Sequence, residues 1–184
     1  AMDFLPSWEG KVLGHHLDYF GERAKGGAAL IIIGGCTIDE TSGAVNMLSA
    51  KDDQFIPGLS GLAQAVQDQG AKIAAQLYHA GRYSHSILMG GRKSVSSSPI
   101  RSRFTGETPR ELSIPEIQQI QGNYALAAAR IKQAGFDAVE VIASAGPLPV
   151  AARRGTLIFL GSPIGPALLA GDREAHLWFR SLLP

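Results

Sequence analysis

Apolar residues follow two alternating patterns along most of this chain, and glycine stands where one pattern gives way to the other. Over residues 15–25 they recur at helical spacing, and over residues 28–33 they form a continuous run. Gly26 and Gly27 separate these segments, which is typical of a helix end, because the position after a helix often takes a positive φ. The pattern predicts a helix followed by a buried strand.

The same order occurs twice more along the chain. A helix predicted over residues 58–69 precedes an apolar run over residues 72–77, again with a glycine between them. A longer helix is predicted to begin after Ser113, and Glu116 three residues later completes the spacing of a capping box. The run over residues 137–142 follows this helix and predicts a third strand.

The repeated order of helix, glycine and buried strand predicts an α/β fold. Continuous apolar runs are typical of parallel strands buried on both faces, and parallel strands need crossover helices. The pattern fits either a doubly wound sheet or a parallel (β/α) barrel of TIM type. Long loops are predicted after two of the strands, over residues 37–57 and 78–112, and their position favours a functional role.

The composition and charge of the chain argue against some kinds of binding partner. The chain has 184 residues, 18% of them charged, and a formal net charge of +1, as in an ordinary globular protein. Without a basic stripe there is no electrostatic case for nucleic acid, and the apolar runs are too short for a membrane span. Cys36 is the single cysteine, so no internal disulfide can form, and we expect a reducing, cytoplasmic setting.

Polar side chains gather where the second strand ends. Gln76 has a planar amide that suits a flavin pyrimidine edge, although an amide there more often caps nearby backbone groups. His79 is a candidate general acid, ligand contact or structural histidine; no second histidine stands at metal spacing, so no metal site is expected. Arg82 can pair with an anion or form a surface salt bridge.

The end of the first strand offers a different kind of candidate. Gly34 and Gly35 would let a flat ring approach the backbone, or they simply form a tight turn. The G-x-G-x-x-G spacing of a dinucleotide fingerprint is missing. Cys36 beside them is a candidate nucleophile, although a cysteine next to a core strand is more often inert.

Residues 76–84, Gln-Leu-Tyr-His-Ala-Gly-Arg-Tyr-Ser, resemble the Q-[LI]-x-H-[AT]-G-R-x-S segment of the Old Yellow Enzyme family. Members of that family are FMN-dependent oxidoreductases built on a (β/α)₈ barrel. Residues 22–27 and 134–141 resemble further parts of the family, so that the likeness runs from about Met2 to Gly146. With Tyr83 after the arginine, the sequence is most similar to the 2,4-dienoyl-CoA reductase branch of the family.

The resemblance implies a partial FMN-binding barrel domain over residues 1–146, with only about the first half of the barrel present. NAD(P)H would reduce FMN, and the flavin N5 would then deliver hydride to an activated C=C bond in a small enone or enoyl-type substrate. Gln76, Gly34, Gly35 and Met2 would contact the cofactor, with the Gln76 amide at the flavin pyrimidine edge.

The resemblance also implies a substrate side, formed by Cys36, His79, Arg82 and Ser144, with His79 and Arg82 expected mainly to shape the loop. In the dienoyl-CoA reductase branch a tyrosine proton donor follows the glycine after the fourth strand. Pro147 stands at that position here and cannot donate a proton, so no catalytic residue is assigned.

From Pro147 the likeness ends, and residues 147–184 form a Pro- and Gly-rich tail that a shifted reading frame would explain. A half barrel exposes sheet edges, so self-association is expected. The alternative to a flavin reductase is a non-catalytic half-barrel fragment or interaction module without flavin. A barrel enzyme acting on phosphate substrates is a third possibility, against which the motif over residues 76–84 argues.

Overall fold

The computed structural model describes residues 5–142. The expected cofactor contact Met2, the expected substrate-side residue Ser144, Pro147 and the rest of the tail lie outside these residues, and the division of the chain at residue 146 stays a prediction. The helices and longer strands of the described part follow one another in the order α1 (Gly14–Lys25), β1 (Leu30–Thr37), α2 (Ile56–Gln67), β2 (Lys72–Tyr78), α3 (Ile114–Gln133) and β5 (Ala138–Val141).

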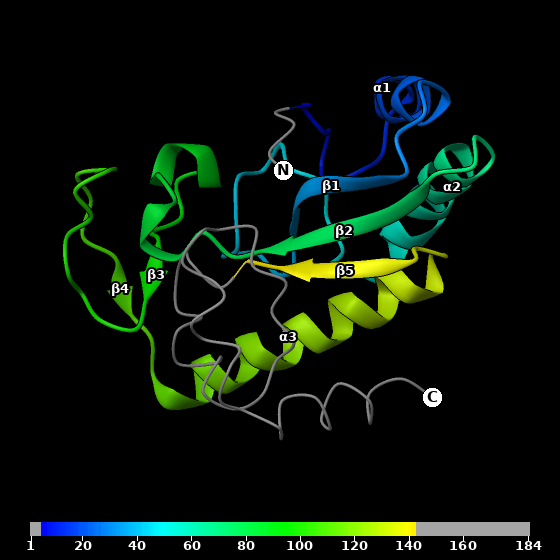
Figure 1. The fold of residues 1–184 in the computed structure, drawn as a ribbon. Coiled ribbons are helices and arrows are strands. Elements are labelled where there is room, and N and C mark those ends of the chain that lie inside the picture. The colour runs from blue at the N-terminus through cyan, green and yellow to red at the C-terminus, as the bar shows by residue number, and fades with distance from the viewer. Residues whose placement is uncertain (1–4, 143–184) are drawn as a thin grey trace, which may run out of the picture.

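The three longer strands form a parallel sheet in the order β1-β2-β5, as predicted from the apolar runs (Figure 1). Ala75 pairs with Ile33 on one side and with Val139 on the other, so β2 lies between β1 and β5. α3 runs along β5 below the sheet in Figure 1, and α1 and α2 lie near the end of the sheet where the strands begin. Because the strands are parallel, their carboxyl ends lie together at the opposite end of the sheet.

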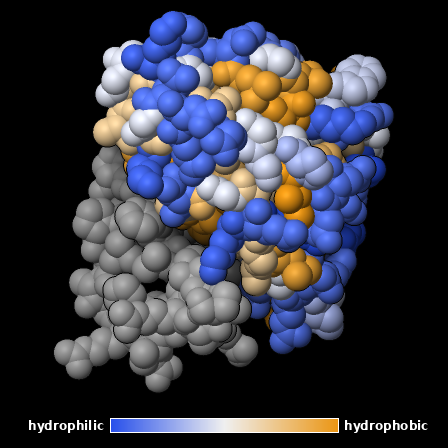
Figure 2. Space-filling model, turned by 90° about the vertical axis from the view of Figure 1, so that its right-hand side faces the viewer, coloured by the Kyte–Doolittle hydropathy of each residue, from blue (hydrophilic) through white to orange (hydrophobic). Residues whose placement is uncertain are grey.

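A single core joins the three helices to one face of this sheet. Its helix members include Phe20 from α1, Leu62 from α2 and Ile131 from α3, and its strand members include Ile33 and Leu77. Because side chains alternate along a strand, the neighbours of these strand residues point to the opposite face. Figure 2 looks at the side where α1 and α2 lie in Figure 1, and shows apolar residues there as separate patches among hydrophilic ones.

The predicted helices are confirmed within two residues at each described end. α3 begins as expected, since Ser113 and Glu116 form the capping box and the Ser113 N–H donates to Glu116 Oε2 at 2.8 Å. The third strand is shorter than expected, Ala138–Val141 instead of residues 137–142. These elements depend on periodicity and caps, which are local properties of the sequence.

β1 differs more from the expectation, because it continues four residues beyond the predicted end at residue 33, as far as Thr37. Pairing with β2 is interrupted after Ile33, which faces Ala75, and resumes at Cys36, which faces Leu77. The strand therefore has two residues where its partner has one, which is a β-bulge.

Both long loops have structure of their own. In the first, Thr37 pairs with Ser49 in an isolated parallel bridge. The second holds a short parallel pair, β3 (Val95–Ser96) and β4 (Arg110–Glu111). It also holds two short 3₁₀ helices, over Gly81–Tyr83 and Ser86–Met89. Within residues 5–142, no helix is both long and apolar enough to span a bilayer.

Candidate functional site

The bulge in β1 lies directly opposite Gln76 in β2. Gly34 and Gly35 are the two β1 residues that stand opposite Gln76, between the pairs Ile33–Ala75 and Cys36–Leu77. Gly35 takes a φ of +59°, a left-handed conformation that side chains disfavour. This turn of the backbone directs the Gly35 N–H to the Gln76 side chain, whose Oε1 accepts at 3.4 Å. The bulge thus brings together the glycine pair and the amide that the sequence analysis placed beside a cofactor.

The other end of the Gln76 amide binds a carboxylate. Gln76 Nε2 donates to Oε2 of Glu140 at 2.8 Å, and Glu140 is the residue that faces Gln76 across the β2–β5 pairing. Both side chains are buried, with exposed fractions of 3% and 8%. Sequence reasoning missed Glu140, although a lone carboxylate between Val139 and Val141 in an otherwise apolar strand is a signal that could have found it.

The backbone at Gly35 is closely approached by Met47 from the loop after β1. A Cβ at Gly35 would collide with the Met47 methyl group, so Met47 packs directly against the backbone at this point. The planar amide of Gln76 has both donor and acceptor groups, which fits the edge of a flat heterocycle with alternating carbonyl and N–H groups, such as a flavin. The described residues therefore fit the group that the resemblance implies.

His79 is fully buried and binds both long loops. Its Nδ1 accepts from the Gly81 N–H at 3.1 Å, and its Nε2 lies 3.2 Å from Oγ1 of Thr41. Because Nδ1 accepts, the neutral ring carries its proton on Nε2 and donates to Thr41. Burial lowers the pKa of His79 below its usual value, against the opposing charge of Asp39, so the neutral form is favoured. These contacts are those of a residue that shapes the loops.

The other two described residues of the expected substrate side lie apart from Gln76. Cys36 is fully buried in the core, on the helix-covered face of the sheet together with Leu77, its partner in register. Arg82 is half-buried, and its guanidinium lies 5.4 Å from the centre of the Tyr83 ring. Gln76, Gly34 and Gly35 thus form one group, and neither Cys36 nor Arg82 joins it.

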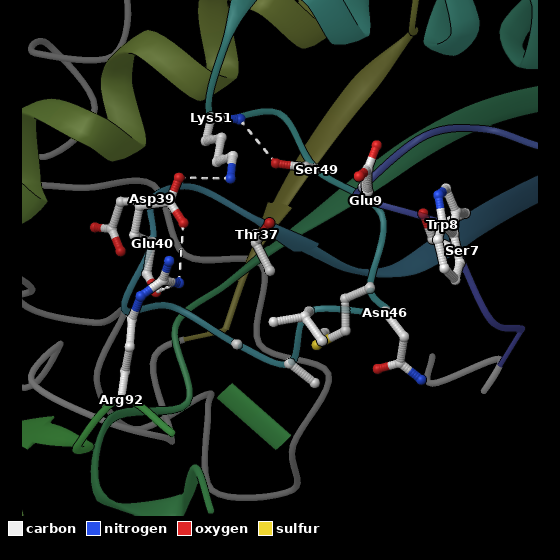
Figure 3. A pocket seen from close by; sticks show the side chains of 15 residues that line it. Ser7, Trp8, Glu9, Thr37, Asp39, Glu40, Asn46, Ser49, Lys51 and Arg92 are labelled. Carbon is white, nitrogen blue, oxygen red and sulfur yellow. Dashed lines mark hydrogen bonds and ion pairs between the residues drawn. The ribbon is translucent and has the colours of Figure 1, made fainter. Parts of the chain in front are cut away.

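A pocket of about 370 Å³ opens beside the loop that follows β1 (Figure 3). Thr37 lines it at the carboxyl end of β1, and Met47 lines it next to Gly35. Charged side chains at the rim of the pocket form ion pairs with one another. Glu40 accepts from Lys51 at 2.6 Å and from Arg92 at 3.0 Å, and the bond to Lys51 is the main reason why the pKa of Glu40 is lowered.

Residues 5–142 contain no group of three or more His, Cys, Asp or Glu side chains that could hold a metal ion. His79, the one histidine next to the candidate site, uses both ring nitrogens for loop contacts.

Comparisons with known proteins give the chain a family. The family described as NADH:flavin oxidoreductase / NADH oxidase matches residues 6–151. A protein named metal reductase from Desulforamulus reducens is 54% identical over 139 residues, which are 76% of this chain but 21% of that protein. The chain therefore spans about a fifth of the length of this curated relative.

Two solved structures share the fold. A complex of 2-naphthoyl-CoA reductase with 2-naphthoyl-CoA superposes with a TM-score of 0.70 at 29% identity, covering 78% of this chain and 24% of that one. Morphinone reductase in complex with tetrahydroNAD superposes with a TM-score of 0.71 at 28% identity, covering 96% of this chain and 52% of that one. These neighbours decide between the two folds that the pattern allowed, so the sheet is part of a TIM-type (β/α) barrel. The chain belongs to the NADH:flavin oxidoreductase / NADH oxidase family, the Old Yellow Enzyme family of FMN-dependent oxidoreductases.

Proposed function

We propose that this chain is the FMN-binding part of an NAD(P)H-dependent oxidoreductase that reduces an activated C=C bond in a small molecule. The observation that carries the proposal is the meeting of the Gln76 amide and the Gly35 backbone in the bulge at the carboxyl-terminal part of β1 and β2. In TIM barrels the active site is built at the carboxyl ends of the strands. Membership of the flavin oxidoreductase family supplies the cofactor class.

Each described site residue has a simple task in this proposal. Gln76 holds the pyrimidine edge of the flavin through its amide, which is both a donor and an acceptor. Gly34 and Gly35 have no side chains of their own, which would let the ring approach the adjoining backbone. Met2 is proposed as a further cofactor contact. The bound flavin supplies the hydride chemistry, and the protein supplies binding and orientation.

We further propose a substrate of the enoyl or dienoyl-CoA type, as in the 2,4-dienoyl-CoA reductase branch. The Arg82-Tyr83 pair of the loop after β2 and the similarity to 2-naphthoyl-CoA reductase support this choice. His79, Arg82, Ser144 and Cys36 form the proposed substrate side. His79 acts through the loops it holds together, and the buried thiol of Cys36 contributes packing rather than contact.

A second function has support in the sheet itself. Within residues 5–142 the sheet is open at both β1 and β5, whereas a closed barrel leaves no edge. A half barrel that associates with itself or with another chain through these edges would be an interaction module and need no flavin. In either case we place the protein in the cytoplasm, in keeping with its single cysteine.

Spectroscopy of the purified chain separates the two functions. We expect a yellow protein, or an apoprotein that binds added FMN in a fluorescence titration and oxidises NADH or NADPH when 2-cyclohexenone or a 2,4-dienoyl-CoA is present. Riboflavin without its phosphate serves as a comparison for the ring contacts, and gel filtration gives the oligomeric state. A colourless, self-associating protein that binds neither FMN nor riboflavin would overturn the flavin proposal and support the interaction module.

A further inference from the structure

Glu140 is the carboxylate that faces the Gln76 amide across two adjacent parallel strands. The two residues occupy the same register position in β2 and β5, and Gln76 Nε2 donates to Glu140 Oε2 at 2.8 Å. We infer that Glu140 is a positioning residue that fixes the orientation of the Gln76 amide toward the flavin. The inference rests on the proposed function, since the flavin is the group that would use the fixed amide.

The orientation of an amide is a choice between two arrangements that exchange its oxygen and its nitrogen. A carboxylate can only accept hydrogen bonds, so Glu140 requires the Nε2 end of Gln76 to face β5. The Gly35 N–H can only donate, so it requires the Oε1 end to face β1. Reversing the amide would set oxygen against oxygen on one side and N–H against N–H on the other. Both neighbours of Gln76 therefore select the same arrangement.

Glu140 influences the orientation of the Gln76 amide more strongly than Gly35 does. Its bond to Gln76 is short and charge-assisted, whereas the Gly35 bond at 3.4 Å is at the long limit for a hydrogen bond. Burial of both side chains excludes competing water and strengthens the preference. If Glu140 were lost, Gly35 alone would hold the amide weakly, and both arrangements would be populated.

A fixed amide matters because a flavin pyrimidine edge has its own fixed order of groups, an N–H flanked by carbonyls. After its bonds to Glu140 and Gly35, the Gln76 amide still has one N–H and one oxygen lone pair to offer. These stand in a single order and can match one neighbouring carbonyl and N–H of the ring. Ordering the amide before binding lowers the entropy lost on binding, as other supporting contacts do.

NMR and FMN titration of the full 184-residue chain test this role with Glu140→Gln. In the unchanged protein we expect the Gln76 side-chain Nε2 protons to give one sharp pair that exchanges with solvent more slowly than that of the exposed Gln119. In E140Q, whose own amide can donate or accept, we expect broadened or doubled signals and an FMN affinity about tenfold lower. Glu111→Gln on β4, an exposed carboxylate, is the matched control and should change neither.

A merely structural role for Glu140 gives a different outcome. Val141→Ala weakens the same strand through the core without touching the amide, so it should lower the free energy of unfolding and leave the Gln76 signals and FMN affinity unchanged. Unchanged Gln76 signals in E140Q, or altered signals with unchanged FMN affinity, would overturn the inference. If the unchanged protein binds no FMN, the proposed function fails, while the amide signals still decide whether Glu140 orders Gln76.

Discussion

The backbone N–H of Gly35 donates to the side-chain oxygen of Gln76 across β1 and β2, two residues 41 positions apart in the chain. The contact exists because β1 has an extra residue at this point and because Gly35 adopts a φ of +59°. A regular strand would use this N–H in the ladder between the strands. The bulge instead turns it toward a side chain, which is how bulges commonly modify the surroundings of an active site.

Replacing Gly35 with alanine should be costly for two separate reasons. The left-handed backbone costs an alanine roughly 1–2 kcal/mol, and the new Cβ would collide with the Met47 methyl group. We expect G35A to lower the free energy of unfolding in urea and to weaken FMN binding in a fluorescence titration.

A matched control for this substitution is Gly27→Ala. Gly27 also has a positive φ, at 94°, but a Cβ added there would have no atom within 4 Å, so G27A incurs the backbone cost alone. The double variant G35A/M47A removes the collision and should recover part of the lost stability. Equal unfolding free energies for G35A and G27A, with equal FMN affinity, would contradict a special role for the bulge.

Replacing Gln76 with alanine tests the cofactor contact directly. Loss of its amide would remove hydrogen bonds to the flavin, and we expect FMN affinity to fall by about 10- to 100-fold. It also leaves the buried Glu140 carboxylate and the Gly35 N–H without this partner, which should cost about 1–3 kcal/mol of stability. Circular dichroism at low temperature shows whether the fold is kept.

Gln119→Ala, which removes an exposed amide from α3, should leave both FMN affinity and stability nearly unchanged. An unaltered flavin occupancy in Q76A would defeat the role assigned to Gln76. The riboflavin titration adds a further check, because Gln76 is proposed to contact the ring. The affinities for FMN and riboflavin should therefore fall by similar factors in Q76A.

The sequence is sufficient for the helices and for the order of helices and strands along the chain, because periodicity, the Ser113 cap and the glycines after each helix act locally. It does not reveal the bulge, since Gly34 and Gly35 fit the end of a strand equally well. Pairing across β1 and β2 forms only when the strands align, and continuing hydrogen bonds carry β1 on to Thr37. A register shift is a property of two segments together.

The residues of the candidate site can likewise be predicted from the sequence only in part. Gln76 and Gly35 can be found from the sequence because their residue types fit a planar ring, but Glu140 is missed, because its partner is 64 positions away in the chain. Arg92 in the loop after β2 is half-exposed and pairs with Glu40 across the pocket rim, a contact between the two long loops. Such pairs depend on the crossover connections that place separate loops side by side, and spacing along the sequence does not encode them.

Substitution of His79 should reveal how it holds the loops. In His79→Ala the Gly81 N–H and the Thr41 hydroxyl lose their partner, and we expect a loss of about 1–3 kcal/mol in the free energy of unfolding at about pH 7.5. Hydrogen exchange should speed up in residues 78–91 more than in α1. Unchanged exchange in this loop would contradict the loop-shaping role.

The lowered pKa of His79 also predicts a pH dependence of stability. Folding favours the neutral ring, so the unfolded chain binds more protons just below its usual pKa of 6.5. The contribution is complete above this value and is lost as the pH falls from there toward the lower pKa of the folded state. The free energy of unfolding in urea should differ less between pH 7.5 and pH 5.5 in His79→Gln than in the unchanged protein. His15→Gln, on the exposed side of α1, should show the same difference between the two pH values as the unchanged protein.

Asp137, the residue directly before β5, should control stability in a more acidic pH range. Its carboxylate pairs with Lys72 at 2.7 Å, and it accepts from the side chain of Gln67 and the N–H of Ile73, both at 3.0 Å. The bond to Lys72 contributes most to lowering the pKa of Asp137 from 3.8 to about 2. Because the folded state favours the ionised form, its contribution is complete above about pH 4 and is lost as the pH falls toward 2.

Urea midpoints measured between pH 5 and pH 2 test this expectation through Asp137→Asn. The variant should be less stable than the unchanged protein at pH 5, and the two should converge toward pH 2, where the native carboxylate becomes protonated too. Asp18→Asn, at an exposed position of α1, should follow the unchanged protein at every pH. Added salt should weaken the Lys72 pair but leave the bond from Ile73, so part of the difference should persist at high ionic strength. A constant offset between D137N and the unchanged protein from pH 5 to pH 2 would mean that the carboxylate acts through packing rather than charge.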